Sequence, residues 1–252
     1  MITDADTHLT PTGAGLSVDE LLAAMDRAGV DRALAWLRPD YCGTEIETHN
    51  AYIYQATRAH PDRILGFGWA DPTVGVGHAQ EMVRRCVYDY GLYGVKLNGA
   101  QNHYFIDDPS LALPVVEEIA RTGKPLALHV GPDAYEQTHP YRAARIADRY
   151  PEMPILMVHM GMRDWPMNRA VIEIAAEHPN MMLIGSAALY ASVLSAIQAL
   201  GPERVCFGSD APFNLMHVEL AAYEALLQGE LCDTGRAAVL GENIARLFGL
   251  PG

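Results

Sequence analysis

Histidine and aspartate side chains stand at or just after the ends of several short apolar runs of this chain. Asp6 and His8 lie beside the first such run, and His129, His159 and Asp210 lie at the ends of three later ones. Imidazole nitrogens and carboxylate oxygens together suit Zn²⁺, Fe²⁺ or Mn²⁺. The residue types therefore predict a site for one divalent cation, provided that the fold brings these side chains together.

The elements that must position these side chains alternate along the sequence. Short apolar runs of β-strand character are each followed by an amphipathic, helix-like stretch. The expected strands are residues 1–6, 33–37, 64–70, 94–97, 125–129, 155–159, 181–184 and 204–208. The expected helices are residues 17–28, 45–59, 77–90, 110–122, 140–149, 166–178, 190–200 and 216–228, and a last one over 234–248.

This alternation predicts an α/β fold, a (β/α)8 TIM barrel with an extra C-terminal helix, as a single domain over residues 1–252. Parallel strands need crossover helices, and eight units in about 250 residues is typical of this barrel. A doubly wound open sheet is the alternative, but no Gly-x-Gly-x-x-Gly turn follows the first strand. In a barrel the carboxyl ends of all strands share one rim, so the dispersed histidines and aspartates are expected to converge there. Asp6 and His8 are two positions apart, so both can turn inward.

Composition excludes several classes of partner. The net charge is −13 with a pI near 5.1, which argues against a basic surface for nucleic acid. Mean hydropathy is +0.01 and no long uncharged apolar run appears, so no membrane segment or signal peptide is expected. The four cysteines form no C-x-x-C pair and are expected to be reduced thiols: Cys42, Cys86, Cys206 and Cys232. We expect a cytoplasmic protein with a small-molecule substrate, and a homodimer stays an open alternative.

Four further polar side chains near the predicted rim are candidates for substrate binding: Lys96, Asn98, His103 and Arg163. Lys96 can hold an anionic group as a point charge, and Arg163 can hold a carboxylate through two hydrogen bonds. A structural alternative exists for each of these two. Lys96 can instead pair with a barrel carboxylate such as Asp4 or Asp71, and Arg163 can simply be solvated.

The segments that carry the candidate histidines and aspartates resemble the amidohydrolase superfamily, in the branch that includes aminocarboxymuconate-semialdehyde and resorcylate decarboxylases. The resemblance covers nearly the whole chain. Its motifs, in order, are ITDADTH (2–8), GVKL (94–97), HVG (129–131), HMG (159–161), GSDAP (208–212) and LGENIARLF (240–248). The resemblance implies that His8, His129 and Asp210 bind the metal and that His159 is a catalytic acid or base.

The sequence departs from the family pattern at Asp6, which stands where the family usually has the first histidine of a His-x-His pair. Some decarboxylases of the branch have a glutamate there. Three arrangements stay open: Asp6 binds the metal directly, holds a ligated water, or leaves a weaker site. We expect one divalent metal, with Zn²⁺ first and Mn²⁺, Fe²⁺ or Mg²⁺ as alternatives, because a carboxylate shifts the preference towards harder ions.

Lys96 has a further meaning in this superfamily, since in other branches a carbamylated lysine from the same strand bridges two metals. Such a bridge would need a second metal about 3.5–4 Å from the first. The sequence offers one convincing ligand set, so a mononuclear site is the expectation.

Three functions follow from such a site. The leading expectation is a hydrolase of a small polar or carboxylated compound, because the chain is compact, with short connections after the second, third and seventh strands. Metal coordination would activate the water for this reaction, since it lowers the pKa of water to near 7 in favourable zinc sites. His159 would then move protons, and Asp210 would orient the water or take its proton. The second is nonoxidative decarboxylation of a hydroxylated aromatic or unsaturated acid, favoured by Asp6 and Arg163. The third is a non-catalytic barrel that binds a ligand, favoured if Asp6 weakens metal retention.

Overall fold

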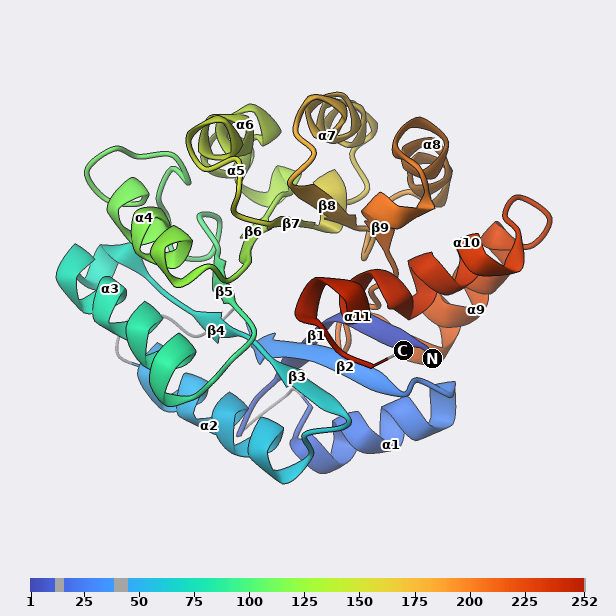
Figure 1. Cartoon of the computed structure of the whole chain (residues 1–252), viewed down its shortest axis with the longest axis horizontal. Helices are drawn as coiled ribbons and strands as arrows, with labels where there is room; N and C mark the ends of the chain where they lie inside the picture. Colours follow the sequence, from blue (N-terminus) through green and yellow to red (C-terminus); the bar gives the residue numbers. More distant parts are fainter. Residues whose placement is uncertain (12–15, 39–44, 252) are drawn as a thin grey trace.

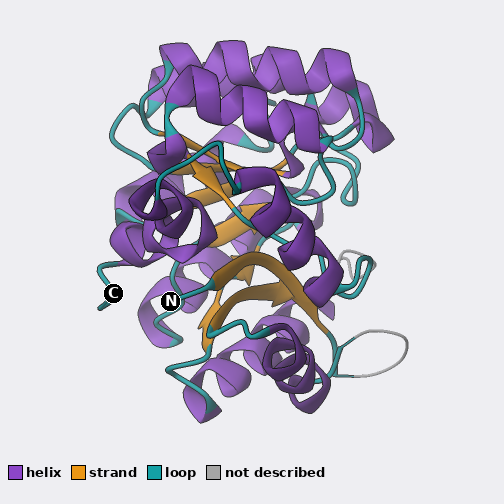
Figure 2. Ribbon diagram, turned by 90° about the vertical axis from the view of Figure 1, so that its right-hand side faces the viewer, coloured by secondary structure: helices purple, strands orange, loops and turns teal. Residues whose placement is uncertain are grey.

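The computed structural model describes residues 1–11, 16–38 and 45–251. In these ranges the strands lie at the centre and the helices surround them (Figure 1), and a side view shows the same arrangement (Figure 2). The strands are β1 (Thr3–Leu9), β2 (Arg32–Leu37), β3 (Ile64–Gly66), β4 (Gly68–Trp69), β5 (Val95–Leu97), β6 (Leu126–His129), β7 (Ile155–Val158), β8 (Met181–Ile184) and β9 (Val205–Cys206). All paired strands run parallel, as the alternation predicts.

The helices follow the predicted order around the strands. They are α1 (Val18–Ala28), α2 (Glu45–Ala59), α3 (Val76–Arg84), α4 (Leu113–Thr122), α5 (Tyr135–Thr138), α6 (Pro140–Arg149), α7 (Trp165–Glu177), α8 (Tyr190–Leu200), α9 (Met216–Leu227), α10 (Asp233–Ala237) and α11 (Asn243–Phe248). Local sequence signals explain both ends of α1. Ser17 and Glu20 form the expected capping box of α1, and Gly29 ends that helix in the left-handed conformation.

Backbone hydrogen bonds join the two sheets into one ring. The sheets are β1-β2-β3 and β4-β5-β6-β7-β8-β9. At the first junction the predicted third strand is split at Phe67, whose N–H donates to the carbonyl of Ala35 at 2.9 Å. At the second junction the N–H of His8 donates to the carbonyl of Ala211 at 2.8 Å. The predicted (β/α)8 TIM barrel is thereby confirmed.

Besides the split third strand, two further predicted elements differ from those observed. The first strand does not end at Asp6 but continues to Leu9, with a register shift between Asp4 and Thr7. The last predicted helix, 234–248, is divided into α10 and α11 by a π-helical stretch in which Gly241 is not helical. A side chain at Gly241 would come within 2.5 Å of the carbonyl oxygen of Met1, so the helix bends where it packs against the start of β1.

The core has an inner layer inside the strands and an outer layer between the strands and the helices. Alternation along each strand divides the residues between the two layers. On β7, Leu156 and Val158 belong to the inner cluster, whereas Ile155 and Met157 belong to the outer one. The same alternation turns Lys96 inward, because its neighbours on β5 belong to the outer cluster. Strand alternation thus selects which polar side chains reach the interior.

In the described part of the chain, no helix combines the length and the apolar character needed to cross a bilayer. Of the cysteines, Cys86 and Cys206 are buried and Cys232 is exposed, and all three are free. Cys42 lies outside the described residues.

Candidate active site

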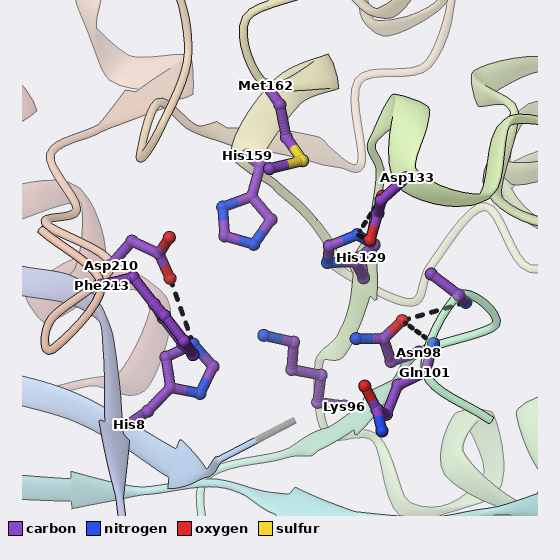
Figure 3. Close-up of a pocket in the computed structure, with 11 residues that line it drawn as sticks. His8, Lys96, Asn98, Gln101, His129, Asp133, His159, Met162, Asp210 and Phe213 are labelled. Carbon is purple, nitrogen blue, oxygen red and sulfur yellow. Dashed lines mark hydrogen bonds and ion pairs between the residues drawn. The ribbon is translucent and has the colours of Figure 1, made fainter. Parts of the chain in front are cut away.

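A pocket of about 360 Å³ opens at the carboxyl ends of the strands (Figure 3). It lies where a TIM barrel places its active site. Side chains from β1, β5 and β6 and from the loops after β5, β6, β7 and β9 line it: His8, Lys96, Asn98, Ala100, Gln101, His129, Asp133, His159, Met162, Asp210 and Phe213. The predicted convergence of distant segments at one rim therefore occurs.

Asp6, His8 and Asp210 form a compact buried group whose potential ligand atoms all lie within 4.8 Å of one another. The Nε2 atom of His8 lies 3.5 Å from Oδ1 of Asp6 and 3.3 Å from Oδ1 of Asp210. Its other nitrogen, Nδ1, lies 2.9 Å from the carbonyl oxygen of Leu37, which can only accept, so Nδ1 carries the proton. Nε2 therefore presents its lone pair to the two carboxylates and accepts a long hydrogen bond of 3.3 Å from Trp36.

This group fits a divalent cation. Oδ1 of Asp6 is buried and has no hydrogen-bond partner among the described residues. A buried carboxylate oxygen without a partner is costly, and a bound cation would satisfy it. Two carboxylates and one neutral imidazole are also a normal donor set for a hard or borderline divalent ion. Asp6, the residue that departs from the family pattern, thus lies in a position to bind a metal directly.

Burial sets the protonation of this group. It lowers the pKa of His8 to about 4, helped by the positive charge of Lys96, so the imidazole is neutral at pH 7. Burial raises the pKa of Asp210 to about 7, and the charge of Asp6 adds to the rise. The short distances from His8 to the two carboxylates are therefore contacts of a neutral ring and are not salt bridges.

His129 lines the same pocket but does not belong to the compact group of three. Its Nε2 atom lies 2.9 and 3.0 Å from the two oxygens of Asp133, a half-exposed residue that the sequence analysis did not single out. A metal-binding histidine commonly uses its second ring nitrogen for such a carboxylate contact. The assignment of His129 as a fourth ligand stays a prediction, and Asp133 is the residue that orients its ring.

His159 reaches the pocket through an unusual turn. Strand alternation would place it outward with Met157, but β7 ends at Val158 and the φ angle of His159 is 71°. Met160 and Met162 also have positive φ angles, of 39° and 54°. Non-glycine residues in this region each cost on the order of 1 kcal/mol. The turn is held by the side-chain amide of Asn168, which donates to the carbonyls of Met160 and Met162.

Ser186 is a buried contact of the site that the sequence analysis missed. Its hydroxyl lies 2.5 Å from Oδ2 of Asp6 and 3.0 Å from Nδ1 of His159. Ser186 follows Ile184, an inward residue at the end of β8, by two positions. If the alternation of inward and outward side chains is continued past the end of β8, it predicts that Ser186 points inward, and this was the signal that could have found it. Burial also lowers the pKa of His159 to about 3, so this ring is neutral as well.

Lys96 is almost fully buried, and its ammonium lies 3.8 Å from the ring centre of Trp36 and 5.3 Å from that of Trp69. In Figure 3 its side chain extends towards the space between His8 and His129. Neither of the two carboxylates named for the alternative pairs with Lys96: Asp4 accepts hydrogen bonds from backbone N–H groups, and Asp71 accepts from Asn102 and Thr73. The indole face favours a cation, which argues against a carbamate at this position.

Of the three remaining substrate-binding candidates, one lines the pocket and two do not. Asn98 lines the pocket, and its Oδ1 accepts hydrogen bonds of 3.0 Å from the N–H groups of Ala100 and Gln101, which shapes the loop after β5. His103 and Arg163 are exposed, and neither is among the described residues that line the pocket. The structure does not bring these two side chains into the pocket, and their role in substrate binding stays a prediction. His103 has a φ of 59°, and Arg163 lies between the turn after β7 and the start of α7, where both side chains face solvent.

Comparison with known proteins identifies relatives of this chain. It is 25% identical over 253 residues to the gamma-resorcylate decarboxylase of Rhodococcus jostii, covering 80% of this chain and 75% of that protein. It is 30% identical over 106 residues to the 2-amino-3-carboxymuconate-6-semialdehyde decarboxylase of Dictyostelium discoideum, covering 40% of this chain and 29% of that protein.

A solved structure has the same fold. The dihydroxybenzoic acid decarboxylase of Polaromonas, with bound manganese and the inhibitor 2-nitroresorcinol, superposes with a TM-score of 0.75 at 19% identity. The match covers 98% of this chain and 96% of that one.

All three of these proteins are decarboxylases. The leading expectation of a hydrolase is therefore wrong, and the decarboxylase alternative agrees better with the relatives. The error arose because a metal-competent barrel rim serves both reactions, and short connections were taken to favour hydrolysis. Residues 3–250 match the family described as Amidohydrolase, and the chain therefore belongs to this amidohydrolase family.

Proposed function

We propose that this protein is a metal-dependent nonoxidative decarboxylase of a hydroxylated aromatic or unsaturated acid. The main supporting observation is that a buried ammonium, Lys96, shares one pocket with His8 and Asp210, which form a compact group with the fully buried Asp6. Such a pocket offers one position for a cation that polarises the substrate and a second, fixed positive charge for a carboxylate. The decarboxylase activity of the relatives supports the same reaction.

The metal in this proposal is held by Asp6, His8 and Asp210, with His129 as the fourth ligand. When bound, a divalent metal supplies a Lewis acid that withdraws electrons from a coordinated substrate oxygen. We favour Mn²⁺ over Zn²⁺, because two of the four side chains are carboxylates. The manganese in the related Polaromonas structure supports this choice.

Lys96 binds the substrate carboxylate in this proposal. It is the one cationic side chain among the described residues that line the pocket. Burial lowers its pKa to about 8, so it still carries its charge at pH 7. Phe213 and Met162 supply apolar surface for the body of the substrate, and the ring of Phe213 meets His8 edge-on at 5.4 Å.

The proton transfers fall to Asp210 and His159. Loss of CO₂ leaves the electron pair of the broken carbon–carbon bond on the substrate carbon, which must then take up a proton. Asp210 lines the pocket and can relay that proton through the carboxylate oxygen that does not bind the metal. His159 also lines the pocket, and in this proposal its imidazole accepts the proton of a substrate hydroxyl during the same reaction.

Measurement of CO₂ release tests the proposal. Protein loaded with Mn²⁺ is incubated with 2,6-dihydroxybenzoate, 5-carboxyvanillate and aminocarboxymuconate semialdehyde, and CO₂ and the decarboxylated product are quantified together. We expect equal amounts of both from at least one acid, and loss of turnover with a chelator. Absence of CO₂ from all three acids, in protein shown to bind Mn²⁺, would contradict the proposal.

The single domain over residues 1–252, the cytoplasmic location and the homodimer stay predictions.

A further inference from the structure

Ser186 connects the candidate metal ligand Asp6 to the candidate catalytic residue His159. Its hydroxyl oxygen lies 2.5 Å from Oδ2 of Asp6 and 3.0 Å from Nδ1 of His159. Ser186 and Asp6 are fully buried, and His159 is 4% exposed. Bulk water therefore does not compete for these hydrogen bonds, and the three groups must satisfy one another.

The number of protons that each of the three groups can donate decides the direction of the hydrogen bonds between them. A serine hydroxyl has a single proton to donate, whereas an ionised carboxylate can only accept. A separation of 2.5 Å is typical of a hydroxyl that donates to a carboxylate. The proton of Ser186 therefore points to Asp6, and the contact with His159 must be donated by the Nδ1–H of the imidazole. Oδ2 of Asp6, another acceptor, also lies 3.4 Å from this Nδ1.

We infer that Ser186 is a positioning residue that holds His159 in its Nδ1–H tautomer, with the lone pair on Nε2 free to act towards the pocket. This assigns His159 the role of a proton acceptor at Nε2. The catalytic part of the inference rests on the proposed decarboxylase function. The tautomer itself depends only on the hydrogen bonds among Asp6, Ser186 and His159.

Gly208 provides the space that this arrangement needs. A Cβ atom at Gly208 would lie 3.0 Å from Cβ of Asp6 and 3.2 Å from Cβ of Ser186. Both distances are shorter than ordinary contacts between carbon atoms. Gly208 follows β9, which lies between β1 and β8, so this glycine lets Asp6 of β1 and Ser186 after β8 approach each other over the intervening segment.

The tautomer can be observed directly by NMR. Protein labelled with ¹⁵N-histidine and loaded with diamagnetic Zn²⁺ gives separate signals for protonated and unprotonated ring nitrogens, and a His159→Asn spectrum identifies those of His159. We expect a protonated Nδ1 and an unprotonated Nε2 in the natural protein. Ser186→Ala should move the proton partly or wholly to Nε2. An Nε2–H tautomer in the natural protein, or no change in Ser186→Ala, would overturn the inference.

Kinetics test the catalytic consequence. Ser186→Ala should lower kcat about 10- to 100-fold, as is typical when a partner of a site residue is removed. KM should stay nearly constant, and the Mn²⁺ affinity should change less than kcat. Ser186→Thr keeps the hydroxyl and should recover part of kcat, whereas Ser192→Ala removes a buried serine of α8 as a control. An unchanged kcat in Ser186→Ala would contradict the positioning role.

If the natural protein proves to have no decarboxylase activity, the proposed function fails, while the NMR result still decides the tautomer.

Discussion

Oδ1 of Asp4 accepts a hydrogen bond of 2.8 Å from the backbone N–H of Ser209, which lies 205 positions later in the sequence. The same oxygen accepts a second bond, of 3.0 Å, from the N–H of Asp6. One buried carboxylate thus links the strand that carries Asp6 and His8 to the segment that carries Asp210. Because this link crosses the junction where the barrel closes, it helps to fix the spacing of the three candidate ligands.

Asp4→Ala should destabilise the protein and weaken metal binding. The substitution leaves two buried N–H groups without their acceptor, and each such loss costs about 1–3 kcal/mol. Urea unfolding and calorimetric titration with Mn²⁺ measure the two effects. Asp4→Asn keeps one acceptor oxygen and should lose less of both. If Asp4→Ala unfolds at the same urea concentration as the natural protein, the link has no structural importance.

Asp210→Ala and His159→Asn should separate metal binding from catalysis. Asp210 lies in the compact group of potential ligands, so its removal should reduce both the metal content and turnover. His159 lies outside that group, so His159→Asn should keep the metal and lose turnover. Elemental analysis of the purified variants, together with CO₂ release, checks both outcomes. Loss of metal from His159→Asn would show that this histidine is a ligand.

Metal affinity should fall as the pH falls below about 7. In the metal-free protein, burial and the charge of Asp6 raise the pKa of Asp210 to about 7. Below this pH a cation must displace a proton, so affinity should drop by up to about tenfold per pH unit. His8 adds nothing to this effect above pH 5, because burial lowers its pKa to about 4. Mn²⁺ titrations at one pH above 7 and at one pH below 7 measure how the affinity changes with pH, and equal affinities would refute the prediction.

Lys96→Met should impair substrate binding without destabilising the fold. The variant keeps an apolar chain between Trp36 and Trp69 but loses the charge that the substrate carboxylate meets. Hydrogen bonds to charged groups contribute about 1.5–3 kcal/mol, so KM should rise about 10- to 100-fold. Stability should be unchanged or higher, because a buried charge is costly. Lys124→Met, at the other lysine of the chain, is the matched control. A normal KM in Lys96→Met would exclude Lys96 from substrate binding.

Much of the fold was predictable from local patterns. Apolar runs followed by amphipathic stretches gave eight strand–helix units, because side-chain periodicity reports directly on strands and helices. The boundaries were less accurate. The first strand continues past Asp6 because His8 pairs with residues after β9, and Gly241 interrupts the last helix where it meets Met1. Both differences come from contacts between distant segments.

The candidate site was predictable only in part. Asp6, His8, His129, His159 and Asp210 all lie at the pocket or its base, because they stand within or just after the carboxyl-terminal half of a strand. His103 and Arg163 are chemically suitable, but their backbone positions turn them to solvent. Asp133 and Ser186 were missed because an ordinary aspartate or serine after a strand gives no distinctive signal.

The sequence by itself determined the order of the strands, the types of side chain available at the rim and the family of the protein, since all three follow from local periodicity and short motifs. The tertiary structure alone decided which of those side chains meet. The contacts of Asp6 with Ser186, of His129 with Asp133 and of Lys96 with Trp36 depend on backbone angles and on closure of the barrel. Hydrogen bonds act only over about 3 Å, so chemical type without position cannot specify them.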